Sequence, residues 1–588
     1  MLIATFPFHE AETALHHEAA AHADGRTVCH LGYDRTRVVI GPIVAPGGAP
    51  CLRCARLWAP VLGLDERDPQ AAPPMAAALI AALLARFAET ERPDPQPWRR
   101  MLWFDLETLL PAEHRLMPHP DCPRCAAVPP PSTLGLREDA PASAESWRER
   151  DKPSLAALTE RLADPRFGLV RHFERETEAK AHSMTFAAFA GRNDPRQLEI
   201  GVGRTGCQAD DRAVAMLEAL ERFSGFRPRG ATPKITARFA DLAEHAVDPR
   251  HFILPKASQQ QEPGYRLEPF DPDRKYKWIK AFSLRRGAEI YLPLQLAYYD
   301  LPQNSADREP LFVSETSNGC ALGASFEEAA LFGLFEVIER DAYFSTWYGR
   351  VVPLPISLDE RDDLYARGMV ARIEEAGFEV SILDIGVGLP LPAIAVLAID
   401  SRPEAPVASI VSTGAHPNAV QALRGALVEV CTRLQHRAPG EIAALRAQGA
   451  AMLADSSRVR SMDDHATLYS HPDSLARLQF LRGGKDGRSL RETSAASVLH
   501  GTANLTRRLR ALSEAVLGVA EDVLLVDMSN SLTASVGLRC VKVLAPGLLP
   551  VTFGHQYRRI DRARLARIDP ALRRDTQGHA PWLPHNFQ

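Results

Sequence analysis

Two stretches of this chain repeat one unusual pattern: two apolar residues, a glutamate, any residue, an apolar residue, then Glu-Arg. They are residues 216–223 (MLEALERF) and 334–341 (LFEVIERD). On a helix, positions i, i+3 and i+4 share one face, so both glutamates and the arginine of each stretch line up. The remaining positions are mostly large and apolar, which is typical of a buried helix. The chain must therefore fold around an interior that holds several carboxylates.

Carboxylates that lie together in a protein interior stay ionised only when their charge is stabilised. Burial and mutual repulsion both oppose their charge unless cations neutralise them. Mg²⁺ binds carboxylate oxygens while leaving positions for phosphates, so it is the cation we expect here. A solvated salt-bridge face is the alternative interpretation, but it does not explain the apolar neighbours. Glu327 and Glu328, about two turns before the second stretch, add to the group.

A glycine-rich turn precedes the first carboxylate helix. Residues 201–206 (GVGRTG) match G-x-G-x-x-G between an expected strand and an expected helix. Taken alone this is a weak dinucleotide signal, because the acidic residue about twenty positions on, Glu221, lies within a helix. We expect the turn and Arg204 to meet phosphate at the helix N-terminus.

The cysteines predict a metal site. Four of nine form two C-x-x-C pairs, Cys51/Cys54 and Cys122/Cys125. Four thiolates match tetrahedral zinc, and a closed four-sulfur site is structural, not catalytic. Four buried cysteines with coincidental spacing are the alternative. The first residues lack the basic stretch of a signal peptide, so reduced thiols and a cytoplasmic location are expected.

Charge and hydropathy exclude two broad classes of function. Lys+Arg total 69 and Asp+Glu 73, giving a net charge of −4. This balance argues against a nucleic-acid binder that relies on bulk positive charge. No apolar stretch reaches the 18 or so residues of a membrane span, so we expect no membrane insertion.

Strand-like and helix-like runs interleave without a βαβ repeat, which predicts an α+β (mixed α/β) fold. The expected strands are 198–202, 289–293, 380–384, 393–399, 523–526 and 541–544, and the main helices are 212–223, 326–347 and 417–434. Proline, alanine and serine after residue 125 predict an exposed linker. The polar residues 455–500 are expected to form a surface insertion. The predicted units are residues 1–135, a linker over 136–164, a large domain over 165–575 and a tail over 576–588.

Residues 313–329 (VSETSNGCALGASFEEA) and the second carboxylate helix strongly resemble the YcaO superfamily. The branch that the chain resembles is the D-type subunit of azoline-forming cyclodehydratases. Residues 541–547 and the ending PHNFQ support this resemblance, which covers roughly residues 165–588. The N-terminal part is similar to the zinc-bearing remnant of a ubiquitin-activating-enzyme-like domain.

The resemblance implies a large domain that binds ATP and Mg²⁺ without a P-loop, using glutamates on buried helices, behind a smaller zinc-bound α/β domain. It implies Mg²⁺ ligands at Glu218, Glu221, Glu328, Glu336 and Glu339. Nucleotide contacts are implied for these residues and for Arg204, Arg222, Asn318, Arg340 and Glu429. The tail is expected to enter the active site, with Pro584, His585 and Gln588 as catalytic candidates.

The implied reaction is ATP-dependent cyclodehydration of Cys, Ser or Thr in a ribosomally made precursor peptide. Phosphorylation of the backbone amide oxygen would lead to thiazoline or oxazoline. Peptide thioamidation and a catalytically inactive nucleotide-binding scaffold are the alternatives. Implied partners are the precursor peptide, a leader-binding protein, a flavin-dependent azoline dehydrogenase and a second copy of the chain as a homodimer.

Overall fold

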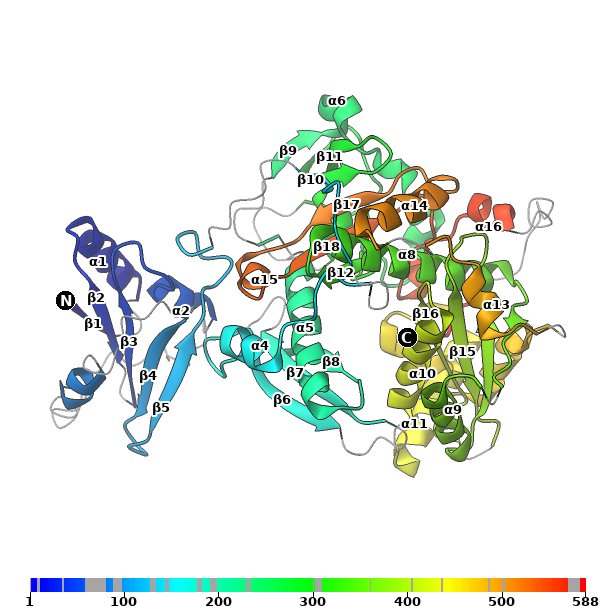
Figure 1. Ribbon diagram of the computed structural model, residues 1–588, viewed down its shortest axis with the longest axis horizontal. Coiled ribbons are helices and arrows are strands. Elements are labelled where there is room, and N and C mark those ends of the chain that lie inside the picture. Colours follow the sequence, from blue (N-terminus) through cyan, green and yellow to red (C-terminus); the bar gives the residue numbers. More distant parts are fainter. Residues whose placement is uncertain are drawn as a thin grey trace.

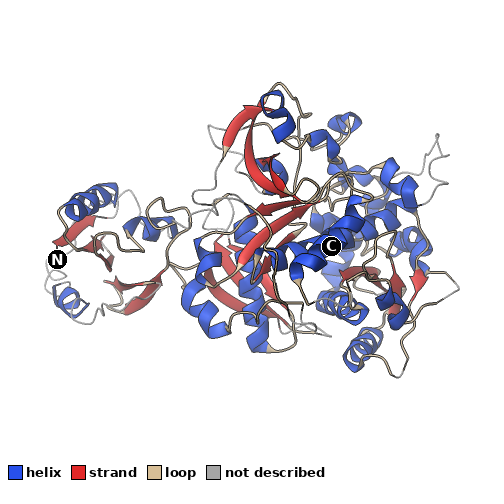
Figure 2. Ribbon diagram, turned by 45° about the horizontal axis from the view of Figure 1, so that its top comes forward, coloured by secondary structure: helices blue, strands red, loops and turns tan. Residues whose placement is uncertain are grey.

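The computed structural model describes most of the chain. The described residues are 2–7, 11–33, 36–58, 81–87, 98–126, 134–142, 147–176, 182–190, 198–226, 228–229, 234–299, 301, 309–359, 361–402, 405–434, 437–484, 487–499, 503–568 and 582–587. Four sheets and the helices around them confirm the α+β class. The N-terminal sheet forms one end of the molecule, and the C-terminus lies within the larger body (Figures 1 and 2).

The N-terminal sheet has five strands in the order β1-β2-β3-β4-β5. β1 and β2 are parallel because α1 crosses between them, and the remaining pairs are antiparallel. Its elements are β1 (Leu2–Pro7), α1 (Ala11–Ala23), β2 (Val28–Tyr33), β3 (Arg37–Val44), α2 (Leu52–Trp58), β4 (Arg99–Asp105) and β5 (Pro111–Leu116).

A three-stranded antiparallel sheet comes next and supports the first carboxylate helix, α5. The helix is longer than predicted at both ends. The elements are α4 (Leu155–Leu162), β6 (Val170–Glu176), β7 (Met184–Ala190), β8 (Leu198–Gly203) and α5 (Gln208–Phe226).

The second carboxylate helix, α8, runs through the larger body for 24 residues. Ser325 caps its N-terminus by accepting a hydrogen bond from the Glu328 amide. Its first half packs on the antiparallel sheet β11-β10-β17-β18-β12, to which β9 is added at β10. The strands and nearby helices are β9 (Ile235–Arg238), α6 (Phe239–Leu242), β10 (Lys275–Ser283), β11 (Ala288–Pro293), α7 (Leu294–Ala297), β12 (Cys320–Gly323), α8 (Phe326–Gly349), α14 (Leu505–Leu517), β17 (Leu524–Asp527), α15 (Ser531–Ser535) and β18 (Arg539–Leu544).

The second half of α8 packs on the antiparallel sheet β13-β14-β15-β16. Side chains alternate between the faces of a strand. In β15, Ala395 and Leu397 face α8, whereas Ile394 and Val396 face α9 and α10. The elements are β13 (Leu354–Pro355), α9 (Leu364–Glu375), β14 (Glu379–Asp384), β15 (Ala393–Ile399), β16 (Ser409–Ala415) and α10 (Ala419–Arg433).

Residues 455–500 differ from the predicted surface insertion. Their apolar residues Leu468, Tyr469 and Leu478 are fully buried and pack in the core beside the end of α8. Composition alone had suggested exposure because polar residues separate these buried anchors. The helices of this region and the C-terminal part are α11 (Pro439–Ala454), α12 (Met462–Leu468), α13 (Leu490–Ala495) and α16 (Arg562–Ile568).

The expected exposed linker also differs from the structure. Over residues 134–142 and 147–152, which we call the connecting segment, the chain lies along the larger body. The Ala142 amide donates to the Ala503 carbonyl at 2.8 Å, and Leu505 donates to Ala140 at 2.7 Å. Trp147 is only 7% exposed and has a left-handed backbone, φ 59°. No helix among the described residues is long and apolar enough to cross a bilayer.

Candidate functional site

The glycine turn allows β8 to pack closely on α5. A Cβ on Gly203 would overlap the Asp211 carbonyl of α5, and one on Gly201 would overlap that of Ala215. The Thr205 amide and hydroxyl both donate to Asp211 Oδ1. The glycines therefore bring strand and helix together, and Asp211 is the acceptor of an amide that we expected to meet phosphate.

α5 carries the first carboxylates of the group, Glu218 and Glu221. Glu218 accepts a hydrogen bond from the Val202 amide at 2.8 Å and pairs with Arg222 at 2.7 Å. Burial raises the pKa of Glu221 well above its usual range, and the charges of Glu336 and Glu218 raise it further. The structure thus brings carboxylates of the two repeated stretches close enough to repel one another.

α8 supplies the second half of the group. Glu336 accepts from the Gly319 amide at 2.9 Å and from Arg340 at 3.0 Å. Glu339 accepts from the Thr413 hydroxyl at 2.6 Å and lies 3.8 Å from Arg340. Burial raises the pKa of Glu339, although the Arg340 charge opposes this. The Glu336 side chain is 27% exposed, so a ligand can reach it.

α10 closes the group with Glu429. Its carboxylate accepts from the Ser412 hydroxyl at 2.6 Å and lies 3.5 Å from Arg204 and 3.8 Å from Arg433. Burial opposes ionisation of Glu429, but the Arg204 and Arg433 charges hold its pKa below the usual value. Arg204 therefore joins the glycine turn to α10 across the site.

Glu327 and Glu328 lie in the first turn of α8 and are both 1% exposed. Glu327 accepts from the amide and guanidinium of Arg137, at 2.7 and 3.0 Å. Glu328 accepts from Arg148 at 3.0 Å and from the Glu149 amide at 2.9 Å. Both carboxylates thus hold the connecting segment, a role that sequence reasoning missed.

The tail docks beside α8. Phe587, 4% exposed, forms a bridge with Val411 of β16, and the Arg340 guanidinium lies 4.2 Å over its ring. Tyr469 donates to the Pro584 carbonyl at 2.6 Å. His585 is buried with both ring nitrogens engaged, by the Thr552 carbonyl and the Phe587 amide. Gln588, expected to be catalytic, lies outside the described residues.

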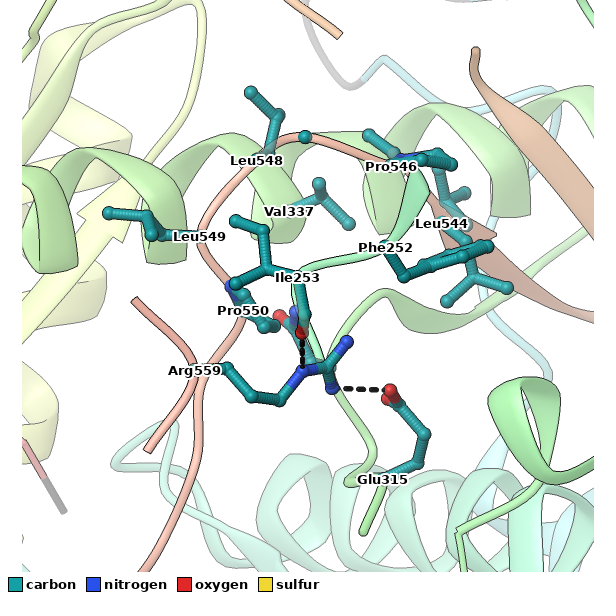
Figure 3. Close-up of a pocket in the computed structure, with 14 residues that line it drawn as sticks. Phe252, Ile253, Glu315, Val337, Leu544, Pro546, Leu548, Leu549, Pro550 and Arg559 are labelled. Carbon is teal, nitrogen blue, oxygen red and sulfur yellow. Dashed lines mark hydrogen bonds and ion pairs between the residues drawn. The ribbon is translucent and has the colours of Figure 1, made fainter. Parts of the chain in front are cut away.

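A small cavity of about 30 Å³ lies beside α8 and is lined by Glu315, Asn318 and Val337 (Figure 3). The side-chain oxygen of Asn318 is buried, with no partner among the described residues. Glu315 is held by Arg559 at 2.6 Å and by Lys542 at 3.5 Å. Asn318 precedes Gly319, whose amide donates to Glu336, so this buried acceptor is placed for a ligand contact. The buried Glu315 ion pairs were not predicted, because their partners lie over 200 residues away.

The four paired cysteines form one cluster. The sulfur atoms of Cys51, Cys54, Cys122 and Cys125 all lie within 4.8 Å of one another. A tetrahedral zinc with Zn–S bonds of about 2.3 Å needs sulfurs about 3.8 Å apart, so the four fit this metal.

Comparisons with known proteins agree with this geometry. A family model described as YcaO cyclodehydratase, ATP- and Mg²⁺-binding, matches residues 200–549. An uncharacterized protein of Methanothermobacter thermautotrophicus is 27% identical over 364 residues, which cover 62% of this chain and 85% of that protein. An uncharacterized protein from the tfuA 3′ region of Rhizobium leguminosarum bv. trifolii is 29% identical over 26% of this chain and 38% of that protein.

Two solved structures share the fold over 96% of this chain. A heterocyclase in complex with substrate and cofactor has a TM-score of 0.72 and 19% identity, with 80% of its chain covered. The heterocyclase TruD has a TM-score of 0.65 and 19% identity, with 78% covered. At this identity the likeness concerns the fold.

The matching family model describes an enzyme that binds ATP and Mg²⁺. Because the family model matches more than half of its length, the chain belongs to the YcaO cyclodehydratase family.

Proposed function

We propose that this chain catalyses ATP-dependent cyclodehydration of Cys, Ser or Thr residues in a ribosomally made precursor peptide. The observation that carries the proposal is the approach of Glu336 on α8 to Glu221 on α5, where burial and then the Glu336 charge raise the pKa of Glu221. Such a group fits Mg²⁺, whose positive charge neutralises the carboxylates on one side and bound phosphates on the other.

The four helix carboxylates are assigned to magnesium, which supplies charge neutralisation for the triphosphate when bound. These are Glu218, Glu221, Glu336 and Glu339. Arg340, Arg222 and Arg204 stand next to them and are suited to orient phosphate oxygens. Asn318 offers its unpartnered oxygen as a nucleotide contact. For Glu328, magnesium binding remains a prediction from the resemblance.

The oxygen of an amide is a poor leaving group, and the proposed reaction therefore phosphorylates it before it leaves. A peptide side-chain thiol or hydroxyl gives up its proton to solvent as it attacks the preceding carbonyl carbon, and the resulting oxyanion attacks the γ-phosphate, which releases ADP. Loss of the phosphate together with the amide proton then leaves the C=N bond of thiazoline or oxazoline. The chain contributes positioning and electrostatic stabilisation, the usual terms in phosphoryl transfer. The tail supports Arg340 through Phe587, so a role for Pro584, His585 and Gln588 in ordering the site is part of the proposal.

Structural zinc at Cys51, Cys54, Cys122 and Cys125 is a second part of the proposal, supported by the sulfur geometry. A precursor peptide, a leader-binding protein, a flavin-dependent azoline dehydrogenase and a homodimer are the proposed partners, and the cytoplasm is the proposed location. They rest on the family resemblance.

The test combines the purified chain, a leader-binding partner from the same gene neighbourhood, its Cys-rich precursor and Mg²⁺-ATP. We expect a mass loss of one water per modified residue, with matching release of ADP and phosphate. Exchange of oxygen for sulfur would support thioamidation in its place. Nucleotide binding without either mass change would support the inactive scaffold.

A further inference from the structure

The four-cysteine cluster is part of the same core as the first carboxylate helix. Cys51, Cys54 and Cys122 belong to one continuous set of buried side chains with Leu220 and Phe223 of α5. The N-terminal sheet and α5 therefore do not have separate interiors. A change at the sulfur cluster is transmitted to α5 by packed side chains, because protein interiors deform little.

Aromatic rings connect the first cysteine pair to α5. The His119 amide donates to Cys54 Sγ at 3.4 Å, and the His119 ring meets Trp58 edge-on with centroids 4.5 Å apart. Trp58, the last residue of α2, is 1% exposed and stacks on Phe223 at 6.0 Å. Phe223 lies two residues after Glu221, so its contacts fix the part of the helix that presents this carboxylate.

An ion pair connects the second cysteine pair to the same residue. Asp121 precedes Cys122 and accepts from Arg229 at 2.8 Å. The Arg229 guanidinium lies 3.7 Å over the Phe223 ring and donates to the Phe223 carbonyl at 3.2 and 3.3 Å. Phe223 is among the last four residues of α5, so Arg229 holds a carbonyl at the C-terminal end of the helix. The Arg229 side chain is only 3% exposed, so little solvent screens the pair.

We propose that the four-cysteine cluster positions the carboxylates of α5, with Arg229 and Phe223 as positioning residues that act through Glu218 and Glu221. This inference rests on the proposed function, in which these carboxylates hold Mg²⁺ and nucleotide. Occupation of the cluster by zinc then sets nucleotide affinity from a site that touches neither nucleotide nor peptide. Supporting contacts of metal ligands typically change affinity by about 10- to 100-fold when removed.

The test measures equilibrium binding of a non-hydrolysable ATP analogue with Mg²⁺ to the full chain by calorimetry. Arg229→Gln removes the ion pair with Asp121, and we expect its Kd to rise about 10-fold while zinc content and circular dichroism stay unchanged. Arg229→Lys keeps a charge for Asp121 and should restore most of the affinity. The matched control is Arg100→Gln, which breaks the pair with Glu113 on the opposite face of the N-terminal sheet and should leave the Kd unchanged.

If Arg229→Gln retains zinc and binds the ATP analogue with an unchanged Kd, the inference is wrong. Should that variant unfold, Phe223→Leu takes its place, because it removes the ring contacts with Trp58, His119 and Arg229 without creating an unpaired buried charge. An unchanged Kd in folded Phe223→Leu overturns the inference equally. Absence of binding by the unsubstituted chain is a separate outcome and would refute the proposed function itself.

Discussion

At the scale of single residues, the site is defined by a group of carboxylates from two helices, and burial together with the Glu336 and Glu218 charges raises the pKa of Glu221. Glu336→Gln and Glu221→Gln each remove one unit of that charge while keeping the shape. We expect ATP turnover to fall about 100-fold or more in either variant and the melting temperature to change little. The measurement is ADP release with substrate peptide, beside a thermal melt.

Glu379→Gln is the control for these two variants. Glu379 is 62% exposed, and its only described ion pair, with Arg482, lies at the surface. Normal turnover in Glu336→Gln or Glu221→Gln would contradict the magnesium assignment.

Two histidines make tail docking depend on pH. His465 accepts from the Gly554 amide and donates to the His585 carbonyl, and the two rings stack 4.0 Å apart. Burial lowers the pKa of His465 to about 4 and holds that of His585 well below its usual value. With the tail undocked, the two histidines therefore bind more protons below pH about 6.5 than with the tail docked. Docking is complete above that pH and is lost as the pH falls toward 4.

Hydrogen exchange at the Phe587 amide, which donates to His585 Nδ1, measures this docking. After correction for the intrinsic exchange rate, protection should be high at pH 7 and low at pH 4.5. Equal protection at both values would show that the histidines do not control the tail.

At the scale of elements, α8 joins three functions along one helix: the connecting segment at its first turn, the carboxylates in the middle and the tail beside Arg340. Deleting residues 585–588 should lower azoline formation much more than melting temperature, because Phe587 supports Arg340 directly. Product mass and a melting curve measure the two effects. Phe587→Leu keeps the tail length but loses the ring, so it should lower azoline formation by an intermediate amount. Unchanged azoline formation after the deletion would show that the tail has no role in the reaction.

The elements themselves were largely predictable. α8 begins at Phe326 as predicted because Ser325 is a good cap, and β15 has its predicted bounds because seven buried apolar residues suit a two-sided strand. The connecting segment and residues 455–500 were not predictable. Their polar composition hides single anchors, Trp147 and Tyr469, whose binding sites are built by distant parts of the chain.

In the candidate site, too, the features set by a local sequence pattern were predictable and the contacts with distant parts of the chain were not. Repetition of the Glu-x-x-Glu-Arg pattern identified the carboxylates, because their helical spacing is local. Partners such as Arg137 for Glu327, or Arg559 for Glu315, could not be found, because only the fold brings them together.

At the scale of the whole molecule, the N-terminal sheet and the carboxylate helix α5 share one core at the cysteine cluster. We expect about one zinc per chain and none in Cys51→Ser. A structural zinc contributes on the order of 10 kcal/mol in small zinc peptides, so the variant should lose more stability than the ~1 kcal/mol of an ordinary substitution. Metal analysis and chemical denaturation measure this, and a stable Cys51→Ser chain would argue against a structural metal.

In the proposed reaction, carboxylates from α5 and α8 couple ATP to loss of water from a peptide. The most direct measurement follows phosphate release and peptide mass together in one reaction, with [¹⁸O] placed in the peptide carbonyl. We expect one ¹⁸O to be transferred to phosphate for each water lost, and both signals to be absent in Glu336→Gln. Water loss with unlabelled phosphate would contradict this reaction, because the amide oxygen would then not have been phosphorylated.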